Sequence, residues 1–148
     1  QWWSDYGEKA AEVGWDIGRS DARCLAIPMH VGRTTQEAID GARNAHDEWI
    51  RFLAPYGRFR AYTLPDGCPV PFDHQPSLEE SIAQDQMIIG SPDECADVIG
   101  RYRDEVGVEH FVMFFDMPGL TQGQMDEQLE LTATEVLPRV GVTLPAAS

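Results

Sequence analysis

Positive charge is scarce in this chain. Its 148 residues include 11 Lys and Arg against 25 Asp and Glu, which gives a formal net charge of −14 and a pI near 4.4. Nucleic acid and anionic lipid bind proteins through clustered Lys and Arg, so neither is an expected partner. The remaining composition, 43% hydrophobic and 24% charged, is typical of one folded domain with a real core.

Long apolar runs and paired cysteines are also missing. No run approaches the roughly 20 residues of a membrane span, and no signal peptide opens the chain; we expect a cytoplasmic protein. The cysteines Cys24, Cys68 and Cys95 are odd in number and contain no CxxC pair, which argues against a disulfide framework. Cys24 and Cys95 lie in apolar patterns that predict burial. The chain begins with Gln1 instead of Met, within a helix-like pattern, so we expect further sequence upstream.

The motifs of several enzyme classes do not occur. There is no GxSxG, no GxxxxGK[ST] and no GxGxxG, and no HxxE, HExxH, CxxC or DxD spacing joins the four histidines to other ligands. We therefore predict no metal site. His46 lies in a segment rich in Asp and Glu and is expected to be solvated.

Strand-like and helix-like segments alternate along the chain. Strands are expected over 23–31, 87–89 and 110–115, and helices over 4–13, 34–54, 77–85, 92–106 and 121–137. The nearly continuous apolar run 110–115 predicts a strand covered on both faces. Alternation predicts parallel strands with covering helices, in an open doubly wound sheet or an arc of a barrel. Residues 58–76 contain four prolines and predict a long loop or inserted excursion.

The stretch GSPDEC, residues 90–95, admits two interpretations: a phosphate cradle or a helix cap. Ser91 and Glu94 have the spacing of a capping box, with Pro92 at the first helical position. Asp93 and Glu94 add negative charge that stabilises a helix start and repels phosphate, which favours the cap. Three further boxes are expected, at Thr34 with Glu37, Ser77 with Glu80, and Thr121 with Gln124.

Sites in parallel α/β folds lie at the carboxyl ends of the strands. The candidates there are His30, Arg33, Gly90, Ser91 and Asp116. His30 is a ligand, a base, a flavin neighbour or a structural residue of the strand. Arg33 is suited to holding an anion, and Asp116 is a general base or a turn former.

Two stretches carry a resemblance to a known family. IIGSPDECADVIGRYRDEVGVEHFVMFF, followed by MPGLTQGQMDEQLELTATEVLPRV, resembles the carboxyl-terminal signature of the bacterial-luciferase-like flavin monooxygenases. In that family an I-G-[ST/D]-P-[DE] turn opens the penultimate barrel helix, and the last helix ends in E-V-x-P, here residues 135–138. Upstream, PMHVGRTTQEA resembles the strand and ETxxEA helix start of limonene-monooxygenase-like members, with Arg33 in place of the glutamate. The resemblance extends over residues 6–140 and leaves 58–76 unmatched.

The resemblance implies a (β/α)8 TIM barrel, of which residues 1–148 would be the carboxyl-terminal βα units of a single domain. It also implies reduced FMN, or F420 in one branch, and a flavin reductase as partner. With O2, the FMN enzymes insert one oxygen atom into a small organic substrate. His30, Arg33, Gly90, Ser91 and Asp116 would line the pocket or contact the cofactor, and the catalytic residues would lie elsewhere. Residues 58–76 would form a lid or pack against a partner subunit.

A second hypothesis does not require catalysis. A partial barrel has open sheet edges and an exposed apolar face, so the chain is alternatively a self-associating module that forms a two-fold dimer. A homo-oligomer is expected under both hypotheses.

Overall fold

A three-stranded parallel sheet forms the centre of the molecule. The computed structural model describes residues 2–16 and 23–142. Strand β1 (Cys24–Val31) lies between β2 (Ile88–Gly90) and β3 (His110–Phe114), in the order β2-β1-β3. β1 pairs with both neighbours in parallel. The predicted mixed α/β class and all three strands are confirmed, and these strands do not close a barrel.

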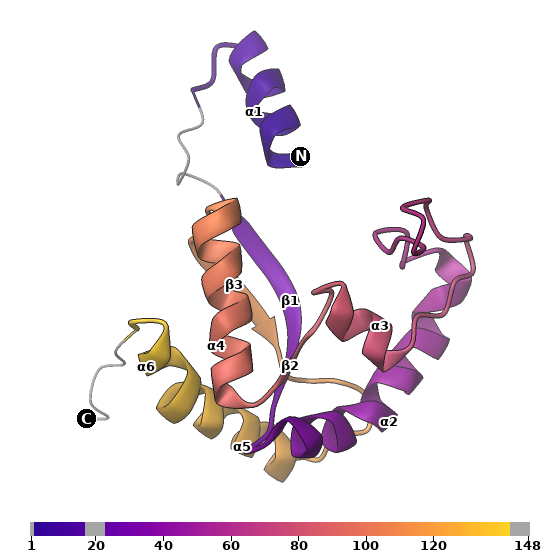
Figure 1. Ribbon diagram of the computed structural model, residues 1–148, viewed down its shortest axis with the longest axis vertical. Helices are drawn as coiled ribbons and strands as arrows, with labels where there is room; N and C mark the ends of the chain where they lie inside the picture. Colours follow the sequence, from indigo (N-terminus) through magenta and orange to yellow (C-terminus); the bar gives the residue numbers. More distant parts are fainter. Residues whose placement is uncertain (1, 17–22, 143–148) are drawn as a thin grey trace.

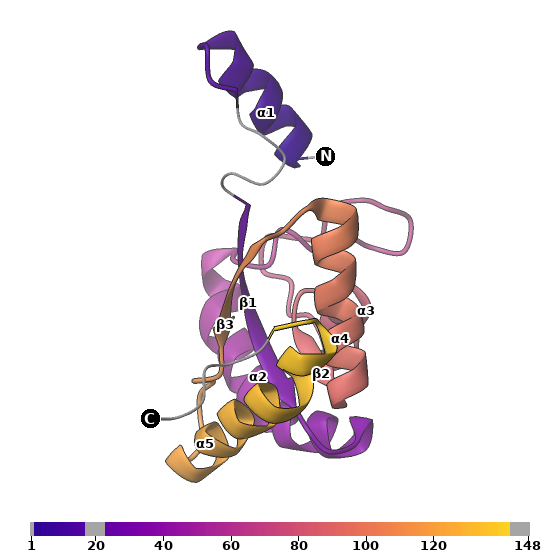
Figure 2. The ribbon, with the colours of Figure 1, turned by 90° about the vertical axis from the view of Figure 1, so that its left-hand side faces the viewer.

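Helices cover the two faces of the sheet (Figures 1 and 2). Helix α2 (Thr35–Leu53), the short 3-10 turn η1 (Ala54–Tyr56) and α3 (Leu78–Ala83) connect β1 to β2 on one face. Helix α4 (Pro92–Arg101) and its π-helical extension η2 (Tyr102–Val106) connect β2 to β3 on the other. The same face carries the final helical run, made of α5 (Gln122–Leu131), η3 (Thr132–Val136) and α6 (Leu137–Arg139). Crossovers on opposite faces are those of an open doubly wound sheet, one of the two arrangements that the alternation predicted.

Four of these helices begin at the capping residues that the sequence predicted, although only two of the four predicted capping boxes are complete. At Ser91 and at Thr121 the cap side chain accepts the N3 backbone N–H and the N3 side chain accepts the cap N–H. Thr34 and Ser77 accept the N3 backbone N–H in the same way. The carboxylate of Glu37 accepts from the backbone N–H of Arg33 instead, and that of Glu80 bonds to the His74 ring.

Two apolar cores lie on the two faces. On the α2 face, small residues let the helix approach the sheet closely: a Cβ on Gly32 would lie 2.4 Å from the backbone nitrogen of Ala38. Met29, Ile88 and Cys95 belong to the core on the α4 face, so the predicted burial of Cys95 is confirmed. Cys24 is exposed, and its predicted burial is wrong, because it begins β1 and the buried part of this strand starts only at Ile27.

Strand β3 is covered on one face only, which corrects the prediction of full burial. Its alternate residues Val112 and Phe114 are 47% and 41% exposed. Helix α2 diverges from the sheet along its length (Figure 1), so nothing in the described chain packs over this face of the edge strand. The apolar run correctly predicted a strand, but one face of this strand is uncovered in the described residues.

Residues 58–76 form an excursion pinned by an isolated antiparallel bridge between Thr63 and Pro69. They follow the carboxyl end of α2 and lie toward the amino-terminal edge of the sheet, away from the strands' carboxyl ends (Figures 1 and 2). Helix α1 (Trp2–Glu12) stands apart from the sheet, beyond the start of β1. None of the helices in the described ranges is long and apolar enough to span a bilayer.

Candidate functional site

The carboxyl edge of the sheet brings three strand ends to the starts of α2, α4 and α5. His30 and Val31 of β1 stand in register with Ile89 and Gly90 of β2. The N–H of Gly32 donates to the carbonyl of Gly90 over 3.1 Å, which extends the pairing past the end of the strand. The edge therefore joins two of the three predicted segments directly.

Gly90 and Ser91 form a helix cap that is already filled by a carboxylate. One oxygen of Glu94, Oε2, accepts from the Ser91 backbone N–H at 2.8 Å, from Ser91 Oγ at 2.9 Å and from Thr35 Oγ1 at 2.8 Å. The hydrogen bond from the Ser91 backbone, followed by that from Thr35, holds the pKa of Glu94 below its usual value. A Cβ at Gly90 would lie 2.7 Å from this oxygen, so a glycine gives the carboxylate its room. The cap interpretation is confirmed, and the donors that a phosphate would need are in use.

Arg33 is paired with two carboxylates. Its guanidinium lies 2.7 Å from Glu127 and 3.1 Å from Glu37, although 62% of the side chain is exposed. The hydrogen bond and charge of Glu127, with that of Glu37, raise the pKa of Arg33. The pair with Glu127 joins the turn after β1 to α5, so this arginine links elements and has no uncompensated charge for an anion.

His30 is a buried neighbour of α2. It is 4% exposed, and a Cβ on Gly41 would lie 2.6 Å from its Nε2. Burial lowers the pKa of His30, so its ring is neutral at pH 7. Its Nδ1 is buried and has no hydrogen-bond partner within the described chain. His30 can supply a neutral imidazole, but its ring is buried against α2.

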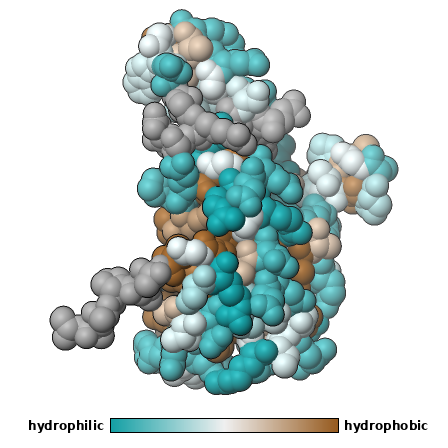
Figure 3. Space-filling model, turned by 60° about the vertical axis from the view of Figure 1, so that its left-hand side comes forward, coloured by the Kyte–Doolittle hydropathy of each residue, from teal (hydrophilic) through white to brown (hydrophobic). Residues whose placement is uncertain are grey.

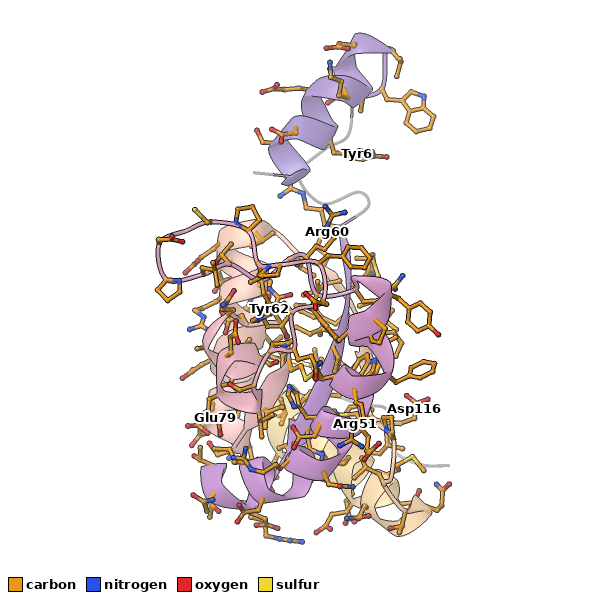
Figure 4. The ribbon with its side chains drawn as sticks, turned by 90° about the vertical axis from the view of Figure 1, so that its right-hand side faces the viewer. Tyr6, Arg51, Arg60, Tyr62, Glu79 and Asp116 are labelled. Carbon is orange, nitrogen blue, oxygen red and sulfur yellow. The ribbon has the colours of Figure 1, made fainter. Side chains whose placement is uncertain are left out.

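Asp116 does not join His30, because β3 leaves the sheet first. Continuing the register beyond the pair Pro28 with Phe114 would set residue 116 beside His30. The amide of Gln128 takes that place: its Oε1 accepts the Val31 N–H at 2.6 Å and its Nε2 donates to the Val31 carbonyl at 2.9 Å. Asp116 is exposed, at the outer margin of the body in Figure 4. Gln128 thus acts as a substitute for strand backbone, and no local pattern in the sequence could reveal it.

A second polar cluster lies under the 58–76 segment. His46 Nε2 is 3.0 Å from Ser81 Oγ, which is 2.8 Å from the hydroxyl of Tyr62, and His46 Nδ1 is 2.9 Å from Asp47. His46 and Ser81 are 0% exposed, so the prediction of a solvated His46 is wrong: it is on the face of α2 turned toward α3. Burial raises the pKa of Tyr62. The order Asp, His, Ser is that of a nucleophilic triad, but a buried serine without access to solvent cannot attack a substrate. The cluster is structural and holds Tyr62 (Figure 4).

A cavity elsewhere in the molecule is lined by none of these groups. About 700 Å³ in volume, it opens between β3, α4 with η2, and the final helical run, and Phe111, Met113 and Phe115 of the β3 segment form one wall. Figure 3 shows apolar side chains exposed in a hollow on this side of the molecule. No cluster of three or more His, Cys, Asp or Glu suited to a metal occurs in 2–16 or 23–142. The cavity is suited to covering by apolar groups, since most of its lining residues are apolar and the polar ones are Arg103, Glu109 and Thr132.

Comparison with known proteins found similarity to monooxygenases, while no family model matches the chain. A 4-hydroxyprotoasukamycin monooxygenase from Streptomyces nodosus subsp. asukaensis is 28% identical over 144 residues, 96% of this chain and 36% of that protein. The chain thus spans about a third of the length of this curated relative.

Two solved structures share the fold. The monooxygenase RslO1 from Streptomyces bottropensis superposes with a TM-score of 0.66 at 19% identity, over 91% of this chain and 36% of that one. The second structure is the oxygenating constituent of 3,6-diketocamphane monooxygenase from Pseudomonas putida, a type II Baeyer-Villiger enzyme in complex with FMN. It superposes with a TM-score of 0.65 at 21% identity, over 97% of this chain and 40% of that one. The fold of this chain is therefore that of a segment of these larger monooxygenases.

Proposed function

We propose that this chain is the carboxyl-terminal part of a flavin-dependent monooxygenase of the luciferase-like kind. Such an enzyme uses reduced FMN and O2 to insert one oxygen atom into a small organic substrate. The observation that supports this is the similarity over 144 residues to a monooxygenase, reinforced by a fold shared with an FMN-bound monooxygenase. The proposal includes a cytoplasmic enzyme, a completed (β/α)8 barrel and a separate flavin reductase.

The residues described here do not fit the phosphate of FMN. A dianion at the start of α4 would compete with the Glu94 carboxylate for the Ser91 donors. Arg33 is already neutralised by Glu37 and Glu127. In this proposal the phosphate is therefore held by residues outside this chain, and Arg33, Gly90 and Ser91 do not contact it.

The chain's own contribution would be a rigid wall of the pocket. Thr35 and Glu94 join the starts of α2 and α4, and Arg33 with Glu127 joins the turn after β1 to α5. Gln128 holds the end of β1. These contacts hold the ends of β1 and β2 and helix α5 in a constant relation, which makes the residues that form them positioning residues for whatever lies over the edge.

The uncovered surfaces support a fold larger than the one that the described residues form. One edge of β3 is unpaired in the described chain, and the apolar cavity opens beside it. Further strands and helices on this side would remove both exposed features. The same uncovered surface also favours the second candidate, a non-catalytic module that covers it by association.

Flavin binding by the native-length protein tests the proposal. The protein is titrated anaerobically with reduced FMN and, separately, with reduced F420, following the fluorescence of its tryptophans. We expect saturable binding of reduced FMN, and no binding of it by residues 1–148 alone. Binding of F420 only would identify the protein as an F420-dependent oxidoreductase. Binding of neither would contradict a flavin enzyme and would favour the second candidate, the non-catalytic module.

A further inference from the structure

We propose that the cavity between β3, α4 with η2, and the final helical run binds a neutral, mainly apolar small molecule that carries one carbonyl or hydroxyl oxygen. None of the candidate residues at the carboxyl edge of the sheet lines this cavity. The inference does not depend on the proposed chemistry, because its test follows an apolar probe and not flavin.

The cavity has the size and the lining of a small-molecule site. Its volume of about 700 Å³ lies within the roughly 300–1,000 Å³ that is usual for ligand pockets. The apolar walls come from β3, α4 and the final helical run, through Phe111, Met113, Ile99, Leu129 and Leu137. Ligand pockets are lined mainly by such side chains, with a few polar groups that fix the orientation of the ligand. This lining selects a ligand with an apolar body.

Both helical walls change to π-helix where they border the cavity. The π-helical segment η2 contributes Arg103 to the lining, and η3 contributes Thr132 and Ala133. π-helical turns are rare and occur frequently at functional sites. Two of them, in two separate helical runs on one cavity, indicate that these walls are shaped for an occupant.

The charges in the lining leave none free for a ligand. The lining contains Arg103 and Glu109, whose charges are opposite. The Arg103 guanidinium donates to both carboxylate oxygens of Asp104, at 2.8 and 3.1 Å, and to the carbonyl of Val140 at 3.2 Å. A charged ligand would therefore enter an apolar cavity without a counter-charge, which is costly. The occupant that fits is neutral.

Thr132 supplies an unused hydrogen-bonding group at the wall of the cavity. It is 6% exposed, and its Oγ1 is covered and has no hydrogen-bond partner in the described chain. Thr134, on the same π-helical segment, instead donates its hydroxyl to the Glu130 carbonyl at 2.8 Å. Buried hydroxyls nearly always have a partner. Rotation about χ1 to another staggered position brings the Thr132 hydroxyl to the cavity, where an oxygen of the ligand gives it that partner.

The cavity is compatible with a larger fold. A further strand beside β3 would lie in the plane of the sheet, about 4.8 Å from β3. Phe111, Met113 and Phe115 belong to the core on the α4 face, so the cavity lies on a face of β3 and not at its free edge. A strand added at that edge would therefore leave the interior of the cavity empty.

Filling the cavity is the first test. The native-length protein is titrated with prodan, a neutral naphthalene ketone whose fluorescence shifts to shorter wavelength in apolar surroundings, and we expect saturable binding. Ala133→Phe places a ring in the cavity and should remove one equivalent of this binding. Thr134→Phe places the same ring on the exposed side of η3 and should remove none. A parent that does not bind prodan, or an Ala133→Phe variant that binds it as the parent does, overturns the proposal.

Removal of the hydroxyl tests the oxygen of the ligand. Thr132→Val keeps the shape of the side chain, so the fold is retained, and removes its hydrogen bond. We expect the affinity for prodan to fall about fivefold, the usual effect of one neutral hydrogen bond. The affinity for pyrene, a hydrocarbon without oxygen, should stay unchanged. An unchanged affinity for prodan, or an equal loss for both probes, overturns the assignment of Thr132 as the partner of the ligand oxygen.

Discussion

Gln128 offers the sharpest test of how β1 is held at its end. Its side chain is 5% exposed and supplies both partners of Val31, which is itself 0% exposed. Gln128→Met keeps the approximate volume of the side chain and removes both hydrogen bonds. A buried backbone group left without a partner costs about 1–3 kcal/mol, so the two groups of Val31 together cost about 2–6 kcal/mol.

The assay is urea unfolding followed by tryptophan fluorescence and circular dichroism. Gln122→Met, an exposed glutamine on the same helix, is the control, and we expect it to change the free energy of unfolding by less than about 0.5 kcal/mol. A Gln128→Met variant as stable as this control would refute the claim that Gln128 replaces strand backbone.

Gln128→Glu separates hydrogen bonding from packing. An ionised carboxylate still accepts the Val31 N–H but turns an oxygen toward the Val31 carbonyl. Only the protonated acid can donate there, so burial and this contact raise the pKa of the new carboxyl in the folded state. A raised folded pKa gives stability that is present at low pH and lost as the pH rises through it. The variant should therefore gain stability relative to the parent on acidification, and a difference independent of pH would contradict the geometry.

Four further outcomes follow from single contacts. Ser81→Ala leaves two buried polar side chains without their shared partner and should lower the free energy of unfolding by about 1–3 kcal/mol in urea melts; an unchanged midpoint would show that neither bond contributes. Gly41→Ala places a Cβ 2.6 Å from His30 Nε2 and should lower the free energy of unfolding by about 1–3 kcal/mol, measured by thermal unfolding; a variant as stable as the parent would show that the His30 ring is not held against α2. The lowered pKa of Glu94 gives stability that is present above about pH 4.3 and lost as the pH falls through the folded value. Glu94→Gln should thus flatten the acid side of the stability profile below about pH 4.3. Burial raises the pKa of Cys95 to about 12, so a thiol reagent at pH 8 should label the two exposed cysteines in the folded protein and the third only on unfolding; labelling of Cys95 in the native state would disprove its burial.

The sequence by itself determined the features that arise from neighbours in the chain. Capping at Ser91 depends on a carboxylate three residues later, and alternating apolar segments predicted the three parallel strands. A contact within one helical turn joins residues three or four positions apart in the sequence, so a local pattern is enough to predict it. The predicted caps and strands were therefore confirmed, and the ends of the strands shifted only slightly.

Only the tertiary structure decided what the candidate residues contact. Arg33 forms an ion pair with Glu127, and Gln128 is hydrogen-bonded to Val31, 97 positions away in the sequence. No spacing in the sequence could predict either pair. His46 is buried because α3 returns over its face of α2, although the letters around it are acidic. The strand order, the uncovered face of β3 and the position of residues 58–76 depend likewise on how whole elements pack. Packing involves segments that are distant in the sequence, and a local sequence pattern does not determine which of these segments will be in contact.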